Sequence, residues 1–256
     1  MRHYARLINS VVAFVAALFL GITLHEFAHG IAALALGATP TIYAGHENNA
    51  PLSPARELLI ALAGPVFSLL IGAAVLVLYR TGRGFGYLFG TWFGVLNAQN
   101  FFSYLMTAPF VAQGDIGKAL RLASAPAPVY LLVFILGGAG TVLLGRILTA
   151  RLLVLTDDTA DNRAAQLRQL AFFTWICGAG IALLLSIGSD TLSRDGLFEA
   201  LGVIAAGYPA TMARFFMRRL SVDGLGFGGR IPWVGIALVA ALAILRLTVL
   251  TQGVRL

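Results

Sequence analysis

The chain has 256 residues, of which 59% are hydrophobic and only 11% are charged, whereas a soluble domain carries about 25% charged residues. This deficit excludes an ordinary water-soluble protein and indicates a surface that faces the lipid bilayer, so the length is best counted in spans of about 20 residues. The net charge is +7, but the arginines are scattered between apolar runs and form no basic face, so no nucleic-acid partner is expected.

Seven apolar runs, separated by charged or Gly/Pro-rich gaps, predict membrane-spanning helices along the chain. The expected fold is all-α: a polytopic transmembrane helix bundle of about six or seven spans, in an integral multi-pass protein of a bacterial-type cell membrane. The sixth run is the weakest, because it contains Glu199 and Pro209. The predicted spans cover residues 8–36, 57–79, 85–110, 127–145, 168–188, 196–213 and 231–250.

The first span carries an HExxH motif, HEFAH. His25, Glu26 and His29 are the only ionisable residues between Leu7 and Leu36, and such groups are costly in lipid unless they have a compensating partner. Two histidines four positions apart share one face of a helix, so both imidazoles can reach one metal ion, while the glutamate is turned aside by about 100°.

This arrangement predicts the chemistry of a zinc hydrolase. Zinc lowers the pKa of a bound water toward 7 and polarises a carbonyl group. Glu26 is then the base that takes the proton of the water and the acid that delivers it to the leaving amine. A buried polar cluster, or a metal site without catalysis, is the alternative interpretation.

The segment between the first two spans, TPTIYAGHENNAP, begins with β-branched residues and is rich in turn formers. An ordinary solvated loop is the preferred interpretation. The alternative is a short strand or β-hairpin, which could pair with an extended substrate. His46 and Glu47 are interpreted as plain polar residues of the loop rather than as gate residues or an alternative ligand pair.

A catalytic zinc site uses three protein ligands and a water, so the two histidines leave one ligand to be found. The motif lies late in the first span, and the loops after the first, third and fifth spans emerge on the same side. Asp115, just after the third span, is the preferred third ligand. Asp195 is a weaker candidate, and Asp223 is disfavoured because it emerges on the opposite side.

Residues 15–122 resemble the site-2 protease family of intramembrane zinc metalloproteases. That family carries HExxH on one core helix, an AGP segment on the next and an Asp-Gly zinc ligand near the end of a third. The similar features here are HEFAH, the ALAGPVFSLLIG segment with Ala63–Gly64–Pro65, and Asn100 and Pro109 ahead of Gly114–Asp115.

The resemblance implies a zinc site with one catalytic residue and three ligands. It assigns Glu26 as the catalytic acid and base, and it assigns the Zn²⁺ ligands as His25, His29 and Asp115. It further implies that Asn97 or Asn100 helps to hold the backbone of the substrate.

The chain differs from the family pattern at two positions and in its charge distribution. Ser68 stands where the family usually has asparagine, and Ile116 follows the aspartate where the family has glycine. In the family's common layout the HExxH helix runs toward the cytoplasm. Here most of the 18 Lys and Arg lie on the amino-terminal side, which favours a cytoplasmic amino terminus and therefore an HExxH helix that runs away from the cytoplasm. The membrane face to which the site opens is therefore left open.

The predicted function is an intramembrane zinc metalloendopeptidase that hydrolyses peptide bonds in or near transmembrane segments of a substrate membrane protein, as in regulated intramembrane proteolysis. Residues 1–122 would form its three-span metalloprotease core, and residues 123–256 would add transmembrane spans of unknown role. Two other classes are alternatives: a catalytically inactive scaffold or binding protein of the same fold, and a metal or proton transporter. The sequence predicts neither the substrate nor an oligomeric state.

Overall fold

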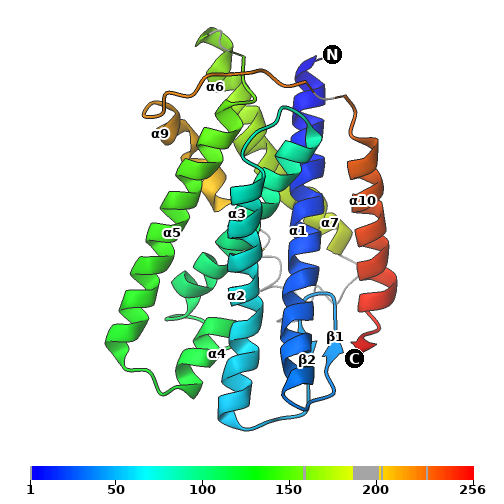
Figure 1. Cartoon of the computed structure of the whole chain (residues 1–256), viewed down its shortest axis with the longest axis vertical. Coiled ribbons are helices and arrows are strands. Elements are labelled where there is room, and N and C mark those ends of the chain that lie inside the picture. The colour runs from blue at the N-terminus through cyan, green and yellow to red at the C-terminus, as the bar shows by residue number, and fades with distance from the viewer. Residues whose placement is uncertain (1, 158–159, 187–201, 203, 229) are drawn as a thin grey trace.

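The computed structural model describes residues 2–157, 160–186, 202, 204–228 and 230–256, and its long helices run roughly along the longest axis (Figure 1). π-helical turns at Gln169–Phe173 and Leu245–Leu250 join α6 to α7 and extend α10, and a 3₁₀ turn at Tyr208–Met212 precedes α9. The described helices are α1 (Arg2–Ala35), α2 (Pro54–Leu78), α3 (Phe85–Thr107), α4 (Asp115–Leu122), α5 (Ala127–Leu153), α6 (Ala160–Arg168), α7 (Thr174–Ser186), α9 (Ala213–Met217) and α10 (Trp233–Ile244).

Five helical segments in the described ranges are long and apolar enough to cross a membrane, which indicates a membrane protein and agrees with the predicted all-α bundle. They correspond to the first, second, fourth, fifth and seventh predicted spans. On α5, Leu131, Leu132, Ile135 and Leu136 are all exposed, as expected for side chains that face lipid. The five segments are Tyr4–Ala35, Pro54–Leu78, Ala127–Leu153, Asn162–Ser186 and Trp233–Leu250.

The third predicted span is α3, which has 23 residues but is not one of these five segments. Its polar residues Asn97, Gln99 and Asn100 lower its hydropathy. Because α3 packs against α1, α2 and α5, other helices rather than lipid surround most of its side chains. A helix in this position tolerates polar groups that are costly on a lipid-facing span.

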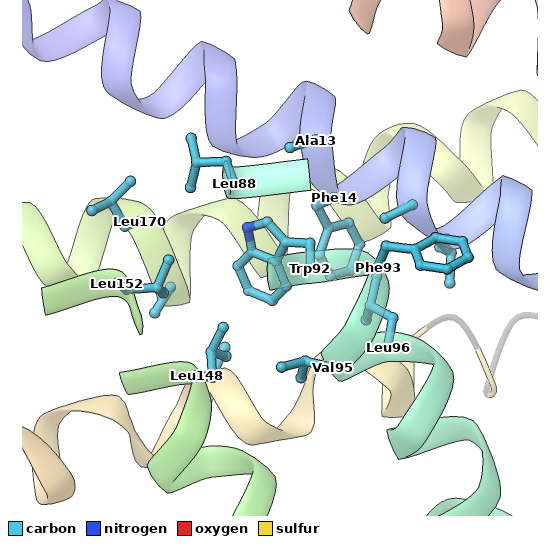
Figure 2. Packing of buried hydrophobic residues seen from close by; sticks show 14 of the residues in the cluster. Ala13, Phe14, Leu88, Trp92, Phe93, Val95, Leu96, Leu148, Leu152 and Leu170 are labelled. Atoms are coloured by element: carbon cyan, nitrogen blue, oxygen red, sulfur yellow. The ribbon is translucent and has the colours of Figure 1, made fainter. Parts of the chain in front are cut away.

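Trp92 of α3 belongs to the main core cluster, together with Leu148 and Leu152 of α5 (Figure 2). The ring of Phe14 from α1 meets the indole edge to face, with 5.1 Å between the centroids. The indole N–H donates to Ser10 Oγ over 3.0 Å, so the polar atom of this buried side chain is satisfied. These contacts fix α3 between α1 and α5.

Two glycines let α2 and α3 approach each other closely. A Cβ atom at Gly72 would lie 2.7 Å from both Ala98 N and Gly94 O, and one at Gly94 would lie 3.0 Å from Gly72 O. Small residues at such a crossing bring two backbones together, and this strengthens van der Waals packing within a membrane. The AGP segment on α2 is thereby held against the other core helices.

The segment between the first two spans forms a β-hairpin, so the alternative interpretation of its sequence is confirmed and the preferred one, an ordinary solvated loop, is wrong. β1 (Thr41–Ile42) pairs antiparallel with β2 (Glu47–Asn48), and at its other edge β1 pairs with β3 (Val254–Arg255), so the strand order is β2-β1-β3. Gly253, just before β3, has a φ of +80°, which favours glycine. The third strand was not predicted, because two residues are too few to form a recognisable pattern.

The sixth predicted span, residues 196–213, lies largely outside the described residues. In its described part the chain forms the 3₁₀ turn Tyr208–Met212, which follows Gly207 as its N-cap and has Pro209 near its start, and then α9. Both elements pack against α5. The structure therefore leaves the existence of a sixth membrane-spanning segment untested.

The α2–α3 crossing can be tested with Gly72→Ala. The added Cβ meets backbone atoms, which cannot rotate away, so we expect a loss of about 1–3 kcal/mol in the free energy of unfolding. Gly180→Ala is the matched control, because a Cβ at that position of α7 meets nothing within 4 Å. Thermal unfolding in detergent should show a lower midpoint for Gly72→Ala alone. Equal midpoints for the two variants would contradict the close approach.

Candidate metal centre

Three side chains that the sequence predicts as metal ligands converge between α1 and the start of α4. His25 and His29 lie one turn apart on α1 and are 2% and 5% exposed, and Asp115 is the first residue of α4. Asp115 Oδ2 lies 3.0 Å from His25 Nε2 and 3.2 Å from His29 Nε2, and the two Nε2 atoms are 3.1 Å apart. Within the described ranges, these residues form the one His/Cys/Asp/Glu group that could hold a metal ion.

The second nitrogen of each imidazole is held by α2. His29 Nδ1 lies 2.7 Å from the carbonyl oxygen of Ile60, and because a carbonyl can only accept, this nitrogen carries a proton. In the neutral ring, His29 Nε2 then presents a lone pair to the centre. His25 Nδ1 lies 3.0 Å from Ser68 Oγ, a hydroxyl that can accept in the same way. Histidines that bind metals are commonly oriented by such partners.

The converging atoms fit a divalent cation. When both rings are neutral and protonated on Nδ1, two imidazole lone pairs and a carboxylate oxygen face one another as acceptors, so they repel one another unless protons or a metal ion lie between them. Ligand atoms around a tetrahedral zinc ion, at 2.0–2.1 Å from the metal, lie about 3.3 Å apart. The distances of 3.0–3.2 Å here are close to that value. Two histidines and one carboxylate are also a known ligand set of catalytic zinc, which keeps its fourth position for water.

The position of Gly64 explains why the AGP segment has a glycine beside the centre. A Cβ atom at this position would lie 2.3 Å from His29 Nε2 and 2.7 Å from His25 Nε2. Any larger residue would therefore fill the space in front of the converging nitrogens. The backbone of α2 itself forms one wall of the centre, directly opposite the two histidines.

Tyr104 of α3 is a neighbour of the centre for which the sequence predicts no role at the site. Its ring stacks on His25, with 5.7 Å between centroids and 8° between planes, and its phenol interacts with the Asp115 carboxylate. Burial alone would raise the pKa of the Asp115 carboxyl, but a protonated His29 and hydrogen bonds from both imidazoles hold it well below its usual range. A metal ion bound at the centre would replace these protons, because metal ligands bind in their deprotonated form.

Two further contacts fix the position of α4. Lys118 Nζ lies 2.7 Å from Glu57 Oε2 of α2. Ile116, which replaces the glycine of the family pattern, is 4% exposed and belongs to a small core cluster with Leu105 and Ala108. Both contacts are within one turn of Asp115 and anchor the helix that presents it.

Glu26 lies beside the centre without being one of its three converging groups. It is 6% exposed and interacts electrostatically with both imidazoles and with Asp115. A carboxylate in this position can accept a proton from a water bound at the centre.

The two asparagines predicted to hold substrate lie on α3. Asn97 is 2% exposed, its Nδ2 donates to Phe93 O over 2.8 Å, and it packs against Gly21 of α1. Its Oδ1 has no hydrogen-bond partner in the part of the chain that the structure describes. Asn100, three residues further on, is half-buried. A role of either residue in substrate binding stays a prediction.

Of the three candidate aspartates, the structure brings Asp115 to the histidines. Asp223 is exposed and belongs to the segment that runs past the end of α5, where Gly226 N donates to Thr156 O over 3.1 Å. It is not part of the converging group. Asp195 lies outside the described residues.

Gly64→Ala should weaken metal binding while leaving the helix bundle folded. The methyl group would occupy the space in front of both Nε2 atoms, so we expect affinity for zinc to fall by about tenfold or more, as when an outer partner of a metal site is lost. Competition with a chromophoric chelator measures this affinity. Gly138→Ala is the control, since a Cβ there meets nothing within 4 Å. Wild-type affinity in Gly64→Ala would contradict this geometry.

Comparison with known protein families, curated proteins and solved structures found no match to this chain. The fold and the arrangement of the centre therefore stand on the chain's own residues. The likeness to site-2 proteases rests on its sequence motifs alone.

Proposed function

We propose that this protein is an intramembrane zinc metalloendopeptidase of the site-2 protease type. One observation carries the proposal: two imidazoles and a carboxylate converge within 3.2 Å in and beside an apolar span, with a second carboxylate, that of Glu26, next to them. A scaffold protein would not need this cluster of ionisable side chains. A metal or proton transporter would not need them in the order of the HExxH motif.

The residues have separable roles in this reaction. His25, His29 and Asp115 would hold the zinc ion, which when bound makes a water nucleophilic near neutral pH and polarises the carbonyl of the scissile bond. Glu26 accepts the proton of that water and returns it to the leaving amine. Ser68 and the Ile60 carbonyl keep both imidazoles turned toward the centre.

The surroundings are consistent with a substrate that itself lies in the membrane. Five apolar segments place the centre within a membrane protein, and we infer an integral multi-pass protein of a bacterial-type cell membrane. A peptide must be extended to be cleaved, and β2 is an edge strand of the small sheet. An unwound substrate segment could add to such an edge through main-chain hydrogen bonds.

Glu26→Gln tests the reaction. The amide keeps the size of the side chain but cannot act as a base, so we expect cleavage to fall by about 10²–10⁴-fold while zinc stays bound. The measurement is N-terminal labelling and mass spectrometry of peptide ends that appear in membranes containing the wild type or the variant. Asp223→Asn is the control and should cleave normally, because Asp223 is exposed and lies outside the converging group.

Unchanged peptide ends in Glu26→Gln would remove the protease proposal and favour a scaffold. Zinc flux into proteoliposomes that survives the same substitution would favour a transporter.

A further inference from the structure

Arg246 is a charged residue inside the last apolar segment, and the site described so far does not use it. It lies in the π-helical turn Leu245–Leu250 that extends α10, and it is 4% exposed. A buried arginine within a membrane span is costly and usually has a function, and π-helical turns within helices are frequent at functional sites.

The guanidinium reaches the loop that follows the HExxH helix. Arg246 Nη1 donates to the carbonyl oxygen of Ala44 over 2.7 Å, and Ala44 is a buried residue of the loop between β1 and β2. Its Cζ lies 5.0 Å from the centroid of the Phe19 ring on α1. One side chain of the last span therefore contacts both the catalytic helix and the hairpin.

This contact lies on the face of α1 that carries the proposed base. Phe19 and Glu26 are seven residues apart, which is nearly two full turns, so they share a helix face. Arg246 is also within electrostatic range of the Glu26 carboxylate. The zinc ligands point elsewhere, toward α2 and α4, so the arginine acts on the side of the base.

The end of the chain joins the same region. β3 pairs with β1, and Leu256 N donates to Pro40 O over 3.0 Å. Leu250 packs in a small cluster with Ile42 and Ala44, against which Phe27 is also packed. Figure 1 shows the hairpin and the C-terminus close together at one end of the molecule. The last span and the end of the chain are thus built onto the hairpin through several contacts, one of which is made by the charged side chain of Arg246.

We propose that Arg246 is a positioning residue of the candidate site: from the last span it holds the β1–β2 loop beside the Glu26 face of α1 and places a positive charge next to that face. The last span then completes a site whose other residues come from the first 122 residues. This inference rests on the proposed function.

The role requires both reach and charge, and two substitutions separate it from a general effect on folding. Arg246→Lys keeps the charge and a donor, whereas Arg246→Met keeps the length and the packing of the stem but neither charge nor donor. Arg151→Met is the matched control. Arg151 is also an arginine that donates to backbone carbonyls, those of Leu76 on α2 and of Tyr79 just after it, but it is remote from the hairpin.

Two readouts are made on the full-length protein. The first is backbone amide hydrogen exchange of residues 41–48 in the metal-free protein, which needs no activity. Arg246→Met should raise this exchange by about tenfold or more, and Arg246→Lys and Arg151→Met should raise it much less. The second is the zinc content together with the kcat and KM of cleavage. Arg246→Met should keep its zinc, and its kcat should fall by about tenfold or more. Arg246→Lys should retain most of the wild-type kcat.

Three results would overturn the proposal: wild-type exchange of residues 41–48 in Arg246→Met, a wild-type kcat in that variant, or a lysine variant no better than the methionine variant. Loss of zinc in Arg246→Met would also overturn it, because the residue would then support the whole fold. If the wild type itself bound no zinc and cleaved nothing, the proposed function would fail, whereas the exchange experiment would still report on the contact with Ala44.

Discussion

The account depends on the mutual repulsion of three acceptor atoms buried in an apolar bundle. The Ile60 carbonyl holds a proton of His29 on Nδ1, so in the neutral ring the Nε2 lone pair faces the carboxylate of Asp115 and, where Ser68 accepts from His25 Nδ1, the lone pair of His25. In a medium of low dielectric such an arrangement is unfavourable by itself, and a divalent cation converts it into a favourable one. The rest of the molecule can be understood as what holds these atoms at this distance. The α2–α3 crossing brings α2 up to the histidines, Gly64 leaves the space between them free, and the Glu57–Lys118 ion pair anchors the helix that carries Asp115.

Much of this arrangement could be predicted from the sequence, because it depends on local periodicity. The spacing of His25 and His29 sets both rings on one face of a helix, and the apolar runs around them indicate a membrane. The side of the membrane on which each loop emerges, together with the order of the motifs along the chain, predicts Asp115 as the third ligand. The structure brings Asp115 to the histidines. The same periodicity holds in α2: Ile60, Gly64 and Ser68 are spaced by four, so the three positions that face the histidines share one face of that helix.

Other features could not be predicted, because they depend on contacts between distant segments. Tyr104 is not a ligand type and lies in a run of aromatic residues, so nothing in its neighbourhood distinguishes it from packing. β3 has two residues, and only the position of the chain end next to the hairpin makes it a strand. Arg246 lies within the last predicted span, but its contacts with Ala44 and Phe19 come from segments far away along the chain, so the sequence around it does not predict them. These contacts also connect residues 123–256, whose role the sequence left open, to the site.

The most direct test of the central claim is the zinc content of purified protein, measured by elemental analysis after preparation without chelators, for the wild type beside Asp115→Ala and His25→Ala. The account predicts one zinc ion per chain in the wild type and a loss of stoichiometric zinc in each variant, because two protein ligands hold the ion far less tightly than three. A wild type without stoichiometric zinc, or an Asp115→Ala variant that keeps it, would contradict the account.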